Sequence, residues 1–107
     1  MRAGDLSPQQ QWVHALALCE SGGRDTIKVF DSNKKYSYGR LQFQAQTWLS
    51  YSDEFGTSMD NIYDGELQEV VATYILNNGG YRNWLNCSRA VSKKLGPYPV
   101  PEAGNSE

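Results

Sequence analysis

Apolar side chains recur at helical spacing soon after the chain begins. The positions that set the pattern are Trp12, Val13, Leu16 and Cys19. Side chains three and four residues apart lie on one face of a helix, so the pattern predicts an amphipathic helix. Ser7 can cap this helix, Pro8 suits its first position, and Gln10 completes a capping box. The pair Gly22-Gly23 is expected to end it.

The pattern changes after this helix. We expect a small hairpin, or flap, of two short strands over residues 26–30 and 36–38, because β-branched and aromatic residues flank a polar turn. A second helix is expected over residues 44–55, ended by Gly56. Residues 57–63 then form a loop.

The clearest helical pattern lies in the second half of the chain. Its apolar positions follow the i, i+3, i+4, i+7, i+8 rule: Leu67, Val70, Val71, Tyr74 and Ile75. Asp64 can cap this helix, and residues 78–80 end it. A last helix is expected over residues 81–95, and the proline-containing residues 96–107 are expected to form a loose tail. The prediction is therefore a compact, mainly α domain (α+β) with a small β flap, over residues 1–95.

Composition narrows the function classes. The chain has 107 residues, 39% of them hydrophobic, which suits one globular domain. A formal net charge of −2 argues against a nucleic-acid binder, which would carry a basic excess. No apolar run approaches the roughly 20 residues of a membrane span. Residues 1–4 are too few and too polar for a signal peptide, so we expect that a leader was removed or that another export route is used.

Glu20 is the side chain with the clearest chemical potential. It follows Leu16 by four residues and Val13 by seven, so it projects from the apolar face in the last turn of the first helix. Desolvation and the negative end of the helix dipole both disfavour its charged form, which raises the expected pKa. A carboxyl group that stays protonated near neutral pH suits a general acid.

Other catalytic chemistries have little support. His14 is the only histidine, and it falls well away from Glu20 around the helix, so we expect it at the surface. The sequence shows no zinc or calcium pattern and no phosphate-binding loop, and we expect neither a metal nor a cofactor. A second carboxylate is not obvious. Asp31 in the flap is the best placed, but aspartate is also common in turns for backbone reasons.

The two cysteines leave two interpretations open. Cys19 and Cys87 are far apart, and in a small domain such a pair often forms a disulfide between early and late elements, which implies an oxidising location. The alternative is two free thiols. Composition does not decide between them.

Several motifs match known families. The matching residues are Cys19-Glu20-Ser21-Gly22-Gly23, Tyr38-Gly39, Leu41-Gln42-Phe43, Thr47-Trp48, and Trp84 with Cys87. This ordered set closely resembles the catalytic domain of resuscitation-promoting factors. A second set resembles the three motifs of soluble lytic transglycosylases: Glu20-Ser21, residues 39–42, and Asn77 with Gly79. Both families belong to the lysozyme-like superfamily, and the resemblance covers about residues 9–87.

The resemblance implies a lysozyme-like fold in which Glu20 is the catalytic acid and Cys19 pairs with Cys87 in a disulfide. Candidate substrate contacts are Tyr38, Gly39, Leu41, Gln42, Phe43, Asn77 and Trp84, and Asp31 is the candidate second carboxylate. Two positions depart from the relatives. Arg40 stands where they have glycine or an apolar residue, and Leu76 replaces a tyrosine.

Some candidate contacts have a structural interpretation too. Trp84 suits core packing, since aromatic residues at helical spacing usually lie inside. The amide of Gln42 suits sugar hydroxyls and N-acetyl groups, but it can equally tie the flap to the next helix. Asn77 can contact glycan or cap a helix.

The expected function is cleavage of peptidoglycan at the β-1,4 bond between N-acetylmuramic acid and N-acetylglucosamine, by a monomer outside the cell or in its envelope. The enzyme would be a muramidase or a lytic transglycosylase. Without a second carboxylate, Glu20 would act first as acid and then as base, for water or for the substrate's own 6-hydroxyl. The alternative is a glycan-binding module on the same fold that has lost turnover, with Arg40 altering the cleft. A purely structural domain explains the motifs poorly.

Overall fold

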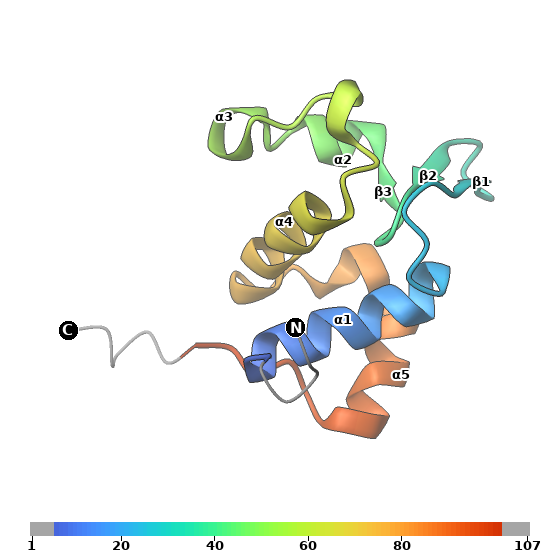
Figure 1. Ribbon diagram of the computed structural model, residues 1–107. Coiled ribbons are helices and arrows are strands. Elements are labelled where there is room, and N and C mark those ends of the chain that lie inside the picture. The colour runs from blue at the N-terminus through green and yellow to red at the C-terminus, as the bar shows by residue number, and fades with distance from the viewer. Residues whose placement is uncertain (1–5, 102–107) are drawn as a thin grey trace.

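The computed structural model describes residues 6–101. Its elements in chain order are α1 (Pro8–Ser21), β1 (Lys28–Phe30), β2 (Tyr36–Tyr38), β3 (Phe43–Gln44), α2 (Ala45–Leu49), α3 (Ser52–Phe55), the 3₁₀ turn η2 (Met59–Asn61), α4 (Gly65–Asn77), the 3₁₀ turn η3 (Tyr81–Trp84) and α5 (Leu85–Leu95). The fold is mainly helical with one small antiparallel sheet, as predicted (Figure 1). No helix in this part of the chain is long and apolar enough to cross a membrane.

Helix α1 is the central element. It packs against both α4 and α5, and the sheet lies beyond its C-terminal end (Figure 1). The capping box at Ser7 and Gln10 is present as predicted. Gly22 ends the helix in the left-handed conformation, with φ of 70°, a value that glycine adopts without steric cost. The last turn of α1 therefore presents its side chains directly beside the sheet.

The sheet has the strand order β1-β2-β3. Residues 36–38 form a strand as predicted, whereas β1 begins at Lys28 rather than at residue 26. Strand β3 was not predicted, because it has only two residues and runs straight into α2. It pairs with β2 through Ser37↔Gln44 and Tyr38↔Phe43. This pairing brings the start of α2 beside the flap.

Two predicted helices are interrupted. The expected helix 44–55 divides into α2 and α3, with a turn at Ser50 and Tyr51. The expected helix 81–95 begins as the 3₁₀ turn η3, and α5 starts only at Leu85. Trp84, the last residue of η3, is buried in the core, as its structural interpretation predicted.

The buried face of α4 differs from the prediction. Val70 and Tyr74 were expected in the core, but they are 52% and 42% exposed. The buried side chains of this helix are Gln68, Val71, Ala72, Ile75 and Leu76. Gln68 is fully buried because its amide is hydrogen bonded to backbone groups, which offsets the cost of burying a polar side chain. The apolar pattern therefore predicted a face of α4 that is shifted from the one that is buried, because it did not include Gln68.

The described part of the segment predicted to be a loose tail is attached to the domain. The indole Nε1 of Trp12 donates to the carbonyl oxygen of Gly96 at 2.9 Å. The rings of Trp12 and Tyr98 meet edge to face at 5.4 Å between centroids. Residues 102–107 lie outside the described residues.

Candidate active site

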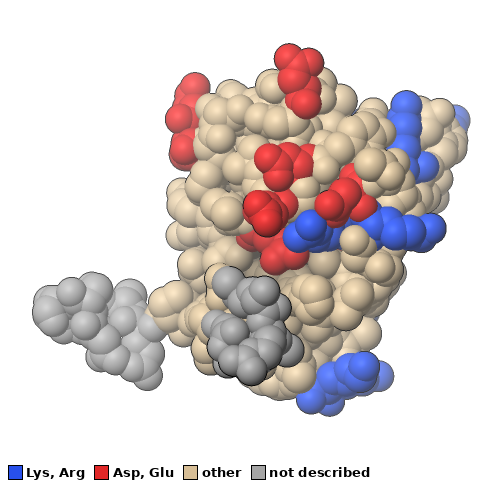
Figure 2. Space-filling view, in the orientation of Figure 1, with Lys and Arg blue, Asp and Glu red and all other residues tan. Residues whose placement is uncertain are grey.

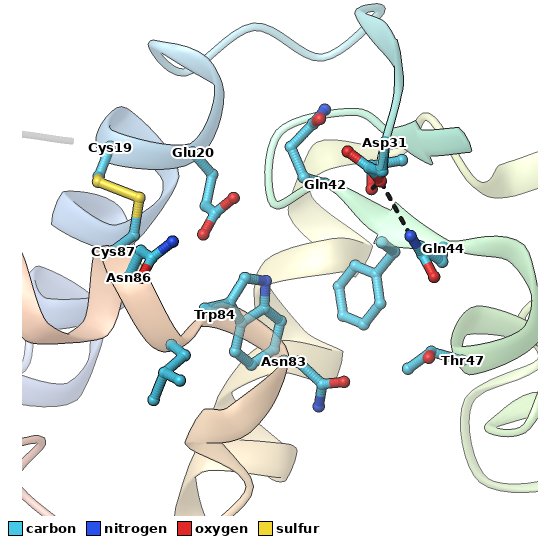
Figure 3. Close-up of a pocket in the computed structure, with 13 residues that line it drawn as sticks. Cys19, Glu20, Asp31, Gln42, Gln44, Thr47, Asn83, Trp84, Asn86 and Cys87 are labelled. Carbon is cyan, nitrogen blue, oxygen red and sulfur yellow. Dashed lines mark hydrogen bonds between the residues drawn. A yellow bond between two sulfur atoms is a disulfide. The ribbon is translucent and has the colours of Figure 1, made fainter. Parts of the chain in front are cut away.

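A cavity of about 600 Å³ lies where the end of α1, the sheet and the η3–α5 segment meet (Figure 3). These three regions, together with Thr47 of α2, supply its lining residues: Cys19, Glu20, Asp31, Ser37, Gln42, Phe43, Gln44, Thr47, Asn83, Trp84, Leu85, Asn86 and Cys87. Amides, hydroxyls and two carboxylates make the lining mostly polar, while Trp84 and Phe43 form an aromatic floor. Such a lining suits a polar ligand with flat faces, such as a sugar.

Glu20 lies in the last turn of α1 and points into the cavity (Figure 3). Two causes raise the pKa of Glu20 from 4.5 to about 7: burial is the larger, and the negative charge of Asp31 is the second. The rise through burial agrees with the sequence-based expectation. A half-buried carboxyl group of this kind is protonated in a large fraction of molecules near neutral pH, as a general acid requires.

Ser21, the residue after Glu20, holds the end of α1 in place through its hydroxyl group. Ser21 is buried, and its hydroxyl lies 2.7 Å from the carbonyl oxygen of Arg40, to which it can donate. The same hydroxyl accepts a hydrogen bond from the backbone amide of Arg24 at 3.0 Å. The residue after Glu20 thus ties the end of α1 to the turn between β2 and β3. This contact holds Glu20 in register with the opposite wall.

Asp31 lies across the cavity from Glu20, at the end of β1 (Figure 3). Its carboxylate accepts hydrogen bonds from the hydroxyl of Ser37 and, at 2.9 Å, from the side-chain amide of Gln44. Asn33 in turn donates to Gln44 at 3.1 Å. Sequence reasoning missed Ser37 and Gln44. The alternation of a strand was the available signal for Ser37, because it faces away from Tyr36 and Tyr38.

The turn from Gly39 to Gln42 connects β2 to β3 and brings Gln42 to the cavity. Gly39 and Gln42 both have positive φ angles, 77° and 55°, and the side-chain amide of Gln42 donates to the carbonyl oxygen of Gly39 at 2.9 Å. The buried amide of Gln68 accepts from the backbone of Leu41 at 2.7 Å and donates to the carbonyl oxygen of Tyr38 at 2.9 Å. A Cβ atom at Gly39 would lie 2.7 Å from this amide, so glycine is required there.

The cavity floor belongs to the core. Trp84 is 2% exposed, and its indole N–H donates to the carbonyl oxygen of Leu41 at 2.7 Å. The ring of Phe43 meets Trp84 edge to face, with 5.5 Å between centroids. For Trp84, lining the cavity and packing in the core are therefore compatible.

A disulfide joins Cys19 to Cys87, which are 68 residues apart. It links the last turn of α1 to the first turn of α5 beside the cavity (Figure 3). Both cysteines line the cavity next to Glu20. The crosslink therefore fixes the Glu20 wall against the η3–α5 wall.

Comparison with known protein families identifies the family of this chain. Residues 7–87 match the family model of the transglycosylase-like domain. The chain belongs to this family. Searches with the whole chain found no matching curated protein and no matching solved structure.

Several predicted contacts of this transglycosylase-like domain lie outside the cavity lining. Leu41 is fully buried in the core, and Gly39 packs against Gln68. Tyr38 lies on the other face of the sheet from Ser37. Asn77 is exposed, and its side-chain oxygen accepts from the Tyr98 hydroxyl at 2.5 Å. The C-cap of α4 is Asn78, so Asn77 does not cap the helix, and it lies outside the cavity lining.

Arg40 also lies outside the cavity. Its guanidinium group donates to Asp25 and to Glu69, each at 2.7 Å. Glu69 belongs to α4, and Figure 2 shows acidic side chains gathered over the region where Figure 1 places α3 and α4. Its side chain is directed to α4 and the 24–25 loop, so Arg40 does not line the cavity.

The residues that the structure adds to the candidate site are polar and come from segments around Gln42 and Trp84. They are Ser37, Gln44, Thr47, Asn83 and Asn86, with Leu85 as an apolar addition. Asn83 and Asn86 lie within two residues of Trp84 in sequence, and this proximity to a predicted site residue could have identified them as site residues. Within residues 6–101 no group of three or more His, Cys, Asp or Glu side chains forms a metal site.

Proposed function

We propose that this transglycosylase-like domain cleaves the glycan strand of peptidoglycan at the β-1,4 bond between N-acetylmuramic acid and N-acetylglucosamine. Membership of the family supports a peptidoglycan-related lytic activity. The observation that carries the finer proposal is Glu20, a half-buried carboxyl group with a pKa raised to about 7 at the wall of a polar cavity.

The first step is proton transfer. Protonated Glu20 donates to the glycosidic oxygen as the C–O bond breaks, and positive charge builds up on the sugar ring that keeps the anomeric carbon. Asp31, on the opposite wall, supplies the negative charge that stabilises this ring. Its hydrogen bonds from Ser37 and Gln44 orient it toward the cavity before the reaction.

The second step uses Glu20 as a base. After losing its proton, the Glu20 carboxylate accepts one from the group that attacks the anomeric carbon. That group is water in a muramidase, or the 6-hydroxyl of the same sugar in a lytic transglycosylase, where the product is a 1,6-anhydro sugar. Either attack regenerates protonated Glu20, so atoms and charge balance over the cycle.

Polar lining residues supply substrate contacts. The amides of Gln42, Asn83 and Asn86 each have donor and acceptor groups, which match the N-acetyl groups and hydroxyls of the two sugars. Phe43 and Trp84, both almost completely buried, close the base of the cavity as part of the core.

The proposed location is outside the cell or in its envelope, with the domain acting as a monomer. The disulfide supports an oxidising compartment, since thiols stay reduced in the cytosol of most cells. Peptidoglycan itself lies outside the membrane, so location and substrate agree.

Mass spectrometry of soluble products tests the proposal. Purified peptidoglycan is incubated with the wild-type chain, with Glu20→Gln and with Glu66→Gln, an exposed glutamate of α4 as a matched control. We expect products from wild type and Glu66→Gln, and a loss of at least about a hundredfold in Glu20→Gln. Anhydro ends identify intramolecular attack and hydrated ends identify water. Binding of peptidoglycan without products from any folded, oxidised variant would instead indicate a glycan-binding module.

A further inference from the structure

The flap has two faces with different chemistry. One face carries Ser37, whose hydroxyl contacts Asp31 in the cavity. Side chains alternate along a strand, so Tyr36 and Tyr38 lie on the other face. Pairing between β1 and β2 places Phe30 opposite Tyr36 and Lys28 opposite Tyr38. We call the side chains of Lys28, Phe30, Tyr36, Tyr38 and Tyr63 the outer flap face.

Four aromatic rings form a continuous row on the outer flap face. Centroid distances are 5.1 Å from Phe30 to Tyr36, 6.4 Å from Tyr36 to Tyr38, and 5.8 Å from Tyr38 to Tyr63. Phe30 is 59% exposed, Tyr36 43% and Tyr63 38%. None of these rings lines the Glu20 cavity. Exposed aromatic side chains that cluster in this way typically mark an interaction surface.

The outer flap face is also positively charged. The Lys28 ammonium lies 4.2 Å from the ring centroid of Tyr36 and 5.6 Å from that of Tyr38. Lys34 and Lys35 are exposed in the adjoining turn. Figure 2 shows Lys or Arg side chains at the edge where Figure 1 places β1 and β2, in contrast to the acidic face over α3 and α4. An anionic ligand therefore meets a favourable potential here.

Hydrogen-bonding groups remain available beside the rings. Of the tyrosine hydroxyls in residues 6–101, that of Tyr98 bonds to another side chain, whereas those of Tyr36 and Tyr63 bond to none. A sugar ring has an apolar C–H face and an edge of hydroxyl groups. Tyrosine matches both, because its ring is apolar and its hydroxyl both donates and accepts.

We propose that the outer flap face binds a second stretch of peptidoglycan strand, outside the cleavage cavity. This inference rests on the proposed function. The sugar rings pack on Phe30, Tyr36 and Tyr63, and carboxylates of the strand, on free lactyl groups or on the attached peptides, pair with Lys28. Five side chains are few for a stable protein partner, which usually contributes about 20–30 residues a side. A repeating polymer suits a small face, because many equivalent segments can occupy it and attachment adds to binding in the cavity.

Sedimentation with insoluble peptidoglycan tests this binding directly. The probe is purified peptidoglycan from which acid has stripped phosphate polymers, and every protein carries Glu20→Gln so that turnover does not interfere. Adding Phe30→Ala with Tyr36→Ala is expected to weaken binding about tenfold. The control is Tyr81→Ala, since Tyr81 is 50% exposed and lies outside both the cavity and the outer flap face. Equal binding by the flap variant and the control would overturn the inference.

A charge variant covers the case in which the aromatic variant folds poorly. Lys28→Glu changes an exposed side chain and is expected to weaken binding more than Lys93→Glu, an exposed lysine of α5. The difference should shrink as salt rises, because screening weakens contacts between exposed charges. Equal losses in the two lysine variants would contradict a specific contact. Loss only on walls that retain phosphate polymers would also overturn the proposal, since it would identify those polymers as the ligand.

Turnover separates the two proposals. With Glu20 intact, each protein is tested on insoluble peptidoglycan and on a short soluble glycan that fills only the cavity. The ratio of insoluble to soluble turnover is expected to fall about tenfold in the Phe30→Ala, Tyr36→Ala variant. An unchanged ratio would reject the outer flap face alone. Absence of turnover by wild type on both substrates would reject the proposed function.

Discussion

The two walls that carry the carboxylates of the candidate site are built differently. The Glu20 wall is anchored by the core, since Leu16 and Ala17 of the preceding turn are buried and Cys19 is crosslinked to α5. The Asp31 wall is a flap in which all three residues of β1 are exposed. Polar contacts from Ser37 and Gln44 position Asp31 instead. Packing therefore places Glu20, the proposed proton donor, whereas hydrogen bonds place the charge of Asp31 opposite it.

This difference suits the proposed reaction. Proton transfer requires the acid within hydrogen-bonding distance of one oxygen atom, and small displacements are costly. Electrostatic stabilisation of a sugar ring tolerates more movement, because Coulomb energy changes gradually with distance. A rigid acid wall and a more adjustable flap also allow a polymer to enter and leave.

The largest expected effect comes from the crosslink of the Glu20 wall. Replacing Cys19 and Cys87 together by serine removes a disulfide that closes a 68-residue separation. The chain-entropy model gives a loss of about 4 kcal/mol in the free energy of unfolding. Urea unfolding followed by circular dichroism measures it. Reduced wild type should match the double variant, and equal stability of oxidised and reduced wild type would show that the crosslink contributes nothing.

The next effect concerns the junction between the walls. Gln68→Leu removes an amide that bonds to Leu41, Tyr38 and Ile62, so buried backbone groups lose their partners. We expect a loss of about 3 kcal/mol in the free energy of unfolding. Gln68 also holds the 39–42 turn, which contains the proposed substrate contact Gln42, so kcat/KM should fall as well. Gln46→Leu, at an exposed position of α2, is the control. An equal free energy of unfolding for the two variants would mean that water, or a rearrangement of the surrounding structure, replaces the lost hydrogen bonds.

The Glu20 wall was the more predictable one, because local patterns determine it. Helical spacing placed Glu20 toward the core, and Ser7 and Gly22 gave the ends of α1. Neither the periodicity nor composition fixed the cysteine pairing, which depends on how α1 and α5 pack. That pairing came from the resemblance to a family.

The flap wall depends on contacts between distant segments, which periodicity does not reveal. Gln44 meets Asp31 only because the short strand β3 pairs with β2. Gln68 occupies a core position because it bonds to the 39–42 turn, so the apolar pattern of α4 gave a shifted face. Asn77 contacts Tyr98 because residues 96–100 return to the domain, where a loose tail was expected.

The contribution of the flap to catalysis can be separated into two parts with Asp31→Asn. Losing the carboxylate that stabilises the charged sugar should lower kcat about a hundredfold, roughly 2.7 kcal/mol in the barrier. The pH profile should move too. In its proposed role Glu20 acts as an acid only when protonated, so activity should fall as pH rises through its pKa of about 7. Asp31 raises that pKa, hence the descending limb should shift to lower pH in the variant.

The change in kcat and the shift of the descending limb can each fail separately, and each failure has its own meaning. Asp53→Asn, an exposed aspartate of α3, should change neither kcat nor the limb. If kcat falls by several further orders of magnitude at every pH, Asp31 takes part in the reaction as nucleophile or general base, and the two-carboxylate scheme replaces the single acid. If the limb shifts while kcat stays near wild type, Asp31 acts only by tuning Glu20. An unmoved limb would show that the charge on the flap does not reach the acid, and that burial in the α1 wall alone sets its proton affinity.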